Sequence, residues 1–190
     1  MFSRLLFVAL SLMATTALAV DRRPYDEGPL TAEDFLHQPK TVPKGTVALT
    51  ATELRFEYKY RYKSNARNTT ATLSSLEITA YIRRDLSWNL SPESKRLLDH
   101  EQGHADIAQI QCLKARLAAR KIIGLQATAG SIEEAQAALG REVSRHMQPF
   151  EDAMREADAE YDRETFHGLG GKQAERRRVQ VETLKKLGEE

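Results

Sequence analysis

A period-two alternation of apolar and polar residues marks the first half of the chain. It is clearest from Glu53 to Tyr62, where it predicts a strand with one face on a core. Residues 46–52 and 69–82 are also rich in Val, Thr, Ile or Tyr, and the polar residues 63–68 read as a turn. We therefore expect an antiparallel meander of three or four strands.

The spacing of apolar residues then becomes helical. Ser91 is a suitable cap, Pro92 fits the first helical position, and Glu93 favours the positive end of the helix dipole. The pattern predicts a helix that continues to Ile123, with Gly124 as its stop. Apolar positions that this helix is expected to bury include Leu97, Ala108 and Ala115.

A second amphipathic helix is predicted from the capping box that Ser131 and Glu134 form. It is expected to reach Arg163, with a kink or break at 145–148 because Pro149 lies inside the pattern. Its apolar stripe consists of Ile132, Ala135, Leu139, Val143, Met147, Phe150, Met154 and Ala157.

The order of these elements sets the fold class. Residues 21–45 hold four of the six prolines, so we expect residues 20–45 to be an extended lead-in with one short ordered piece at 30–36. Glycines at 168, 170 and 171 predict a loop before a charged helix over 172–187. Strands followed by helices indicate an α+β fold, with residues 46–190 as one domain.

The N-terminus predicts export. Arg4 precedes the apolar run Leu5–Met13, and the small-residue segment that follows ends at Ala19, which is typical of a secretory signal peptide over residues 1–19. The run is shorter than the roughly 20 residues of a membrane-spanning helix. We expect a periplasmic or secreted protein with no stable membrane insertion after cleavage. The lone Cys112 cannot form an internal disulfide.

Net charge excludes one class of partner. The chain has 28 basic and 27 acidic residues, and cleavage removes Arg4, which leaves 27 of each. A nucleic-acid-binding protein is expected to be markedly basic, so none is predicted as a partner. The sequence does not indicate an oligomeric state.

The candidate chemistry begins with a histidine pair on the first predicted helix. His100 and His104 are four residues apart, which places them about 40° apart on one face with about 6 Å of rise. Two imidazoles at that spacing reach one zinc ion, and Glu101 lies beside it as a general base for a zinc-bound water. Gly103 costs about 1 kcal/mol within a helix, so we expect another backbone or the substrate to approach it closely.

A catalytic zinc site also needs a third protein ligand and an open fourth position. We interpret His37 and His146 as ordinary polar or partly buried histidines. The remaining candidates lie between Tyr161 and Gly168.

In that segment, residues 161, 164 and 167 share one side if the helix persists. His167 would complete a three-histidine site, and Glu164 a site with two histidines and one carboxylate. The sequence leaves open whether the third ligand is His167, Glu164 or Asp162. Tyr161 is a candidate donor to an oxyanion, and Asp162 a candidate partner that orients a ligating imidazole.

These motifs resemble a known family. The segment 100–104 with Asp106-Ile107-Ala108, together with 161–168, is similar to the bacterial domain of unknown function 922, whose members are described as predicted zinc-dependent proteases. Segments 29–35 and 87–88 also fit, and the resemblance extends from about residue 30 to 187. Ala105 and Ala32 stand where an aromatic residue and a tryptophan are more typical. The resemblance implies a zincin-like fold in which His167 belongs to the site.

The leading expectation is an exported zinc metallohydrolase of the peptidase type, acting on a peptide or protein. Zinc held by His100, His104 and His167 would polarise the scissile carbonyl, Glu101 would act as the base, and Tyr161 would hold the oxyanion. A hydrolase acting on a cell-wall peptide, or on another ester or amide, would use the same parts.

Two alternatives stay open at this stage. A structural or sequestering metal site would fill the fourth position with Glu164 or Asp162. A helical interaction protein of the cell envelope would carry the motif by chance. Residues 21–45 are a candidate inhibitory segment.

Overall fold

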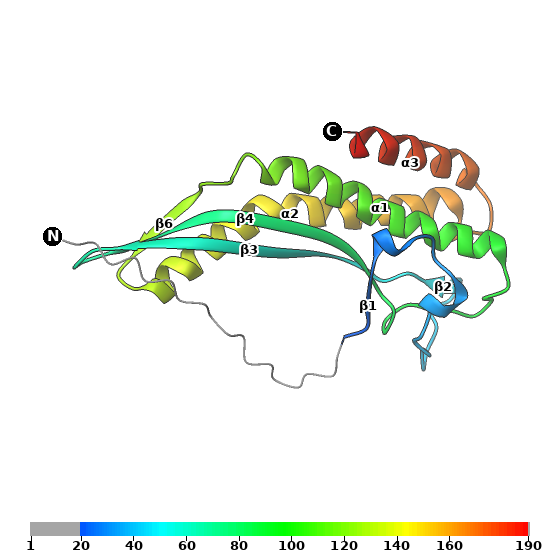
Figure 1. Cartoon of the computed structure of the whole chain (residues 1–190). Coiled ribbons are helices and arrows are strands. Elements are labelled where there is room, and N and C mark those ends of the chain that lie inside the picture. Colours follow the sequence, from blue (N-terminus) through cyan, green and yellow to red (C-terminus); the bar gives the residue numbers. More distant parts are fainter. Residues whose placement is uncertain (1–19, 190) are drawn as a thin grey trace.

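A long antiparallel hairpin and two long helices form the frame of the protein (Figure 1). The computed structural model describes residues 20–189, so the predicted signal peptide lies outside the described residues. The strands are β1 Arg22–Pro24, β2 Ala48–Leu49, β3 Thr52–Ser64, β4 Thr69–Arg83, β5 Trp88–Asn89 and β6 Gln126–Ala129. The helices are α1 Lys95–Ala119, α2 Ile132–Thr165 and α3 Gln173–Gly188, with 3-10 turns at Tyr25–Glu27 and Ala32–Asp34.

The main sheet has four antiparallel strands, which confirms the α+β class. β4 pairs with β3 from Thr69 to Ile82, with one shift in register between Lys59 and Tyr60, and its other edge pairs with β6 at one end and β1 at the other. The strands expected at 53–62 and 69–82 are thus confirmed as β3 and β4.

The expected strand at 46–52 is reduced to β2, which pairs with β5 in a separate two-stranded sheet. β1 and β6 were not expected. Both are short and lack an alternating pattern, because their pairing depends on the exposed edge of β4 rather than on local sequence.

Helix α1 starts later than predicted. The cap is Ser94, whose side chain accepts a hydrogen bond from the backbone of Leu97. Ser91 instead lies in a turn, where its carbonyl accepts a 3.0 Å hydrogen bond from Ser94 N. The helix ends at Ala119, and a turn leads to Gly124 at φ 93°. The expected stop therefore lies at the end of the turn rather than directly after the helix.

Helix α2 confirms its capping box and corrects the expected break. Ser131 and Glu134 make both reciprocal hydrogen bonds. The helix then runs for 34 residues through Pro149 without interruption. Pro149 is solvent-exposed, so water can donate to the backbone carbonyl that loses its helical hydrogen bond at the proline. Met147 and Met154, on either side of Pro149 in the sequence, are buried.

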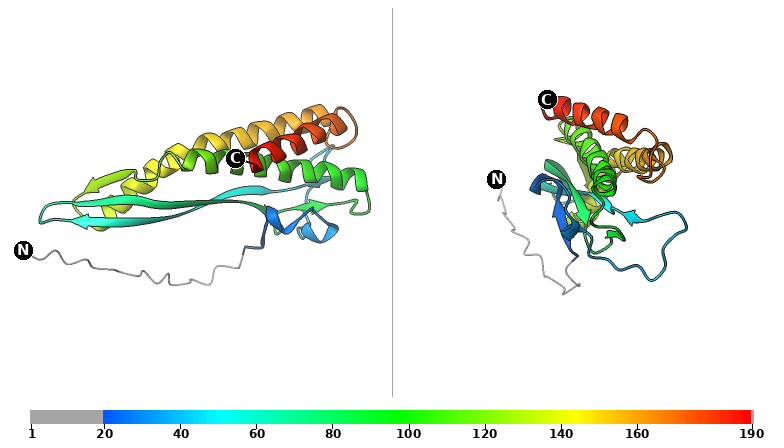
Figure 2. Two further views of the ribbon diagram at one scale, coloured as in Figure 1. Left: turned by 45° about the horizontal axis from the view of Figure 1, so that its top comes forward. Right: turned by 90° about the vertical axis from the view of Figure 1, so that its right-hand side faces the viewer.

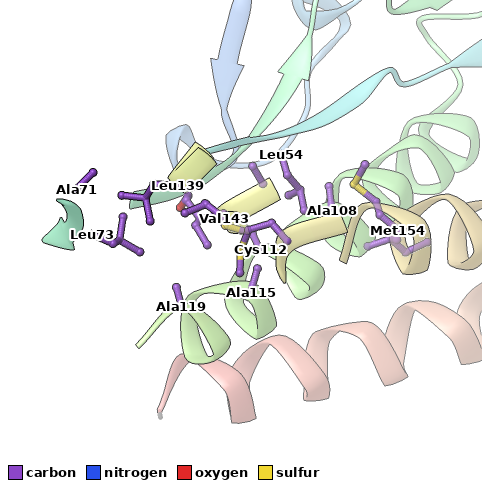
Figure 3. Close-up of a cluster of buried hydrophobic side chains, with 14 of the residues drawn as sticks. Leu54, Ala71, Leu73, Ala108, Cys112, Ala115, Ala119, Leu139, Val143 and Met154 are labelled. Carbon is purple, nitrogen blue, oxygen red and sulfur yellow. Dashed lines mark hydrogen bonds between the residues drawn. The ribbon is translucent and has the colours of Figure 1, made fainter. Parts of the chain in front are cut away.

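The core lies between the inner face of the sheet and both long helices (Figure 2). Along α1 the buried positions facing the sheet are small, which allows a close approach of helix and sheet. Figure 3 shows part of this cluster, including Leu54, Leu73, Ala108, Cys112, Ala115, Ala119, Leu139, Val143 and Met154. Ile132 is the exception in the predicted stripe of α2, with 41% of its surface exposed.

Helix α3 packs mainly on α1. Arg177 pairs with the buried Asp106, and the side-chain amide of Gln180 donates to the carbonyl of Gly103. Within residues 20–189, no helix is both long enough and apolar enough to cross a membrane.

The core generates a stability prediction. Leu139→Ala removes a fully buried side chain between α2 and the sheet and should lower the free energy of unfolding by about 2–5 kcal/mol. The matched control on the same helix is Ile132→Ala, which should change it by less than about 0.5 kcal/mol because that side chain is exposed. Urea unfolding followed by circular dichroism measures both. Equal effects of the two substitutions would contradict this core.

Candidate metal centre

The two long helices each present a pair of polar side chains four residues apart, and the pairs face each other. His100 and His104 come from α1, and Asp158 and Asp162 come from α2. Asp162 Oδ1 lies 3.1 Å from Nε2 of each histidine. The two Nε2 atoms are 3.3 Å apart. Within residues 20–189, His100, His104 and Asp162 form the one group of potential metal ligands whose atoms converge in this way.

The donor set fits a zinc ion. Ligand atoms about 2.0–2.1 Å from a tetrahedral zinc are separated from one another by about 3.3–3.4 Å. The three distances here are 3.1, 3.1 and 3.3 Å, so these atoms lie close to three vertices of such a tetrahedron. Two imidazoles and one carboxylate are also ordinary zinc ligands.

Outer hydrogen bonds orient both imidazoles. His104 Nδ1 donates to Asp158 Oδ1 at 2.9 Å. The Thr165 hydroxyl donates to the Tyr161 carbonyl at 2.6 Å, which leaves its oxygen free to accept from His100 Nδ1 at 3.3 Å. With each Nδ1 carrying the proton, the Nε2 lone pairs point at the shared centre, as metal-ligating histidines require.

The charges around this centre favour a cation. Burial opposes a positive charge on His104, but hydrogen bonds to Asp158 and Asp162 and the charge of Glu101 outweigh it and raise the His104 pKa to about 10. Burial also raises the pKa of Asp162, but hydrogen bonds from both histidines outweigh it and hold that pKa well below its usual range. In the metal-free cluster His104 therefore keeps a proton. A metal ion would compete with that proton for the same ligand atoms.

Glu101 lies beside the three candidate ligands and is almost completely buried, with 2% of its surface exposed. The Thr50 hydroxyl, just after β2, donates to Glu101 Oε2 at 2.6 Å. Burial raises the pKa of Glu101, and the nearby histidines and Thr50 oppose that rise. The sequence predicted that Glu101 lies one step round the helix from His100. In the structure it lies there, next to the Nε2 atoms of His100 and His104.

The centre opens into a cavity of about 490 Å³. Its lining includes Glu101, Asp158 and the three converging side chains, together with Trp88 and residues of β2. Another wall comes from the lead-in, through His37, Pro39, Thr41 and Pro43, and from Thr46 just after it. The inhibitory role considered for the lead-in stays a prediction, but this segment does border the cavity.

His167 lies at the edge of the same cavity. Its Nδ1 is 3.3 Å from Asp162 Oδ2, the oxygen that does not face the other histidines. Phe166 and His167 both have left-handed backbone conformations, at φ 52° and 51°, which is uncommon for residues with side chains. The structure thus brings His167 to the cluster through Asp162.

Two other sequence candidates are placed elsewhere. The Glu164 carboxylate pairs with Arg176 at 3.3 Å and Lys172 at 3.4 Å, both at the start of α3. His146 is exposed on α2.

Tyr161 packs against His100 in the candidate site. Its ring stacks on that of His100, with centroids 4.8 Å apart and planes 9° from parallel. Its hydroxyl is buried without a hydrogen-bond partner among the described residues, and Tyr161 is not one of the described residues that line the cavity. Its expected role as an oxyanion donor stays a prediction, while its visible role is to hold His100 in place.

The packing of Tyr161 explains Gly103. A Cβ atom at position 103 would lie 2.3 Å from the Tyr161 hydroxyl oxygen and 2.4 Å from its Cζ. The close approach expected at this glycine is therefore made by a side chain of α2, not by a backbone or a substrate.

Three residues of the site were missed in the sequence. Asp158 carried a usable signal, because its four-residue spacing to Asp162 matches that of the histidines on the facing helix. Thr165 lies inside the second motif, but nothing in the sequence marked its hydroxyl as a partner of His100. Thr50 gave no local signal, since its contact with Glu101 spans 51 positions.

Comparisons of the chain with protein-family models, with curated proteins and with solved structures found no match. The interpretation of the site therefore rests on its geometry and on its motifs. Both depend on individual side chains, so both can be tested by substitution.

The contact between Gly103 and Tyr161 predicts that Gly103→Ala lowers the stability of the protein, which is the opposite of the usual effect of this substitution in a helix. Glycine to alanine within a helix ordinarily stabilises by about 1 kcal/mol. Gly103→Ala should instead destabilise, because the new methyl group displaces the ring that supports His100, and overpacking of this kind costs about 1–3 kcal/mol. We expect a lower thermal midpoint and weaker zinc binding, measured by calorimetry.

Gly170→Ala is the matched control, since the nearest atom to its new Cβ would be Phe166 Cδ2 at 3.9 Å. It should leave zinc binding unchanged. If Gly103→Ala binds zinc as tightly as the unchanged protein and unfolds no earlier, the proposed support of His100 by Tyr161 is wrong.

Proposed function

We propose that the protein is a zinc-dependent metallohydrolase whose ion is held by His100, His104 and Asp162. The observation that carries the proposal is the convergence of three ligand atoms, 3.1–3.3 Å apart, at the base of a cavity beside a buried glutamate. Three protein ligands with the fourth direction open to a cavity is the arrangement of catalytic rather than structural zinc sites.

Asp162 replaces His167 as the third ligand in this proposal. Its Oδ1 already lies at ligand spacing from both histidines, whereas His167 Nδ1 is next to the other oxygen, Oδ2. We assign His167 the task of holding Asp162 so that one oxygen faces the ion. The left-handed backbone at residues 166 and 167 places that ring over Asp162.

Zinc in this position would polarise a scissile carbonyl and make a water molecule more acidic. Glu101 then takes the proton of the attacking water and later delivers it to the leaving group. Burial raises the Glu101 pKa, and the nearby histidines and the Thr50 hydroxyl oppose that rise. The Thr50 hydroxyl fixes the carboxylate for both steps.

Peptide or protein is the substrate class that we propose. The support is the pattern His-Glu-x-x-His on a helix with the glutamate facing the cavity, and the resemblance of 100–104 and 161–168 to the predicted proteases of the domain of unknown function 922. We further propose a zincin-like fold, with α1 as the active-site helix under the sheet. The predicted signal peptide supports action in the periplasm or outside the cell.

The ligand assignment predicts different outcomes for two neighbouring carboxylates. Asp162→Ala should weaken zinc binding by more than the roughly 10- to 100-fold that loss of an outer partner costs. Glu164→Ala, the matched control two residues away, should leave binding unchanged because that carboxylate pairs with α3. Equilibrium dialysis against a zinc buffer measures both. Loss of zinc only in the Glu164 variant would move the third ligand to that residue.

The general-base assignment predicts separation of binding from turnover. Glu101→Gln keeps the shape of the side chain and should retain one zinc per chain, while kcat falls by about 10²- to 10⁴-fold. Glu156→Gln, on the exposed face of α2, is the control and should be fully active. A quenched fluorescent peptide mixture reports turnover, and elemental analysis reports zinc. Unchanged turnover in the Glu101 variant would refute the mechanism.

A further inference from the structure

A second charged feature lies far from the metal centre, on the distal half of the β3–β4 hairpin. Residues 58–76 contain Lys59, Arg61, Lys63 and Arg67 but neither aspartate nor glutamate. The chain as a whole is almost balanced, at a formal net charge of +1. This local excess of cations is therefore a departure from the rest of the sequence.

Alternation of exposed and partly buried residues along β3 places Lys59, Arg61 and Lys63 on one face, and strand pairing fixes the rows of Arg61 and Lys63. Lys63 lies opposite Thr70, which pairs in turn with Thr128 of β6. A 2.8 Å hydrogen bond between the two threonine hydroxyls confirms that these side chains share a face. Arg61, Thr72 and Gln126 form the next row across the same three strands.

We call this surface the basic face: Lys59, Arg61, Lys63, Thr70, Thr72, Gln126 and Thr128. The intervening residues, including Ala71 and Leu73, point to the opposite side and are buried in the core. The helices cover that inner side, so the basic face is the outer side of the sheet (Figure 2).

No residue in the part of the chain that the structure describes neutralises the cations of the basic face. Lys59, Arg61 and Lys63 are exposed, and none of them has an ion pair with any residue in the range 20–189. Nearer the metal centre, Arg55 pairs with Glu57, and Glu57 lies opposite Glu77. The row of free positive charge therefore begins beyond Glu57 and continues toward the turn.

We propose that the basic face binds a linear acidic polysaccharide. Alternate residues of a strand are about 6.6–6.8 Å apart, so the three cations form a row along β3 rather than a compact pocket, which suits a chain with repeated negative charges. The row crosses the shift in β3–β4 pairing between Lys59 and Tyr60. The hydroxyl and amide groups beside the row provide hydrogen-bond partners for sugar hydroxyls. No apolar side chain belongs to the face as defined, so it lacks the anchor that an interfacial membrane protein uses.

In Figure 1 the turn of the β3–β4 hairpin and β6 lie at one end of the molecule, and β2, whose residues line the cavity, lies at the other. About 12 residues of strand separate Lys63 from Thr50 at the cavity, which corresponds to about 40 Å. Binding at the basic face would hold the protein on an acidic polymer while the cavity stays open. The proposal is independent of the zinc chemistry, because none of its residues contacts the metal centre.

Polygalacturonate, a linear carboxylated polysaccharide, is the probe that tests the proposal, with neutral dextran and polyglutamate for comparison. We expect the full chain to bind polygalacturonate, more weakly as salt rises, and not to bind dextran. The triple variant Lys59→Gln, Arg61→Gln, Lys63→Gln should bind at least about tenfold more weakly. The control variant Arg178→Gln, Lys185→Gln, Lys186→Gln removes the same charge from exposed positions of α3 and should change binding less than about twofold.

Thr70→Val with Thr128→Val tests the sugar contacts at constant charge. It should weaken binding to polygalacturonate and leave any binding to polyglutamate unchanged. Circular dichroism and zinc content establish that each variant is folded. The proposal is overturned if the two triple variants lose affinity equally, if no binding to polygalacturonate occurs at low salt, or if polyglutamate or anionic lipid vesicles bind as tightly.

Discussion

The crossing of α1 and α2 at the Tyr161 ring is the contact on which the metal centre depends. One side of that ring supports His100, and its hydroxyl occupies the space left by the missing side chain of Gly103. Because the helices approach this closely, Asp162 of α2 comes within 3.1 Å of the two imidazole nitrogens of α1. The small buried residues of α1 extend the same close packing toward the sheet. The site is thus a consequence of helix packing, and not of a binding loop.

A bound cation would stabilise a buried cluster of this kind. Glu101 is 2% exposed, and removing a charged group from water is costly unless an opposite charge compensates. In the metal-free protein a proton on His104, with its raised pKa, supplies part of that compensation. Zinc would supply it more fully and would stabilise the folded state by mass action. Zinc binding would therefore be coupled to the stability of the helix crossing.

Local sequence pattern was sufficient to predict the long strands and helices and the part of the candidate site that lies on α1. Alternation predicted β3 and β4, caps predicted α2, and the four-residue spacing of His100 and His104 placed Glu101 beside them. Contacts between distant segments were not predictable in this way: β1 and β6 form on the edge of β4, and Thr50 reaches Glu101 from the other sheet. Sequence spacing left His167, Glu164 and Asp162 all open as the third ligand, with His167 favoured, since spacing does not tell how α2 is rotated against α1.

The most direct test of the central claim is an anomalous difference map from crystals grown with zinc and measured at the zinc absorption edge. We expect one peak about 2.0–2.2 Å from His100 Nε2, His104 Nε2 and Asp162 Oδ1, with the fourth coordination position facing the cavity. A peak ligated by His167 in place of Asp162 would restore the three-histidine site and contradict the assignment made here. No peak at the helix crossing at saturating zinc would contradict the metallohydrolase as a whole.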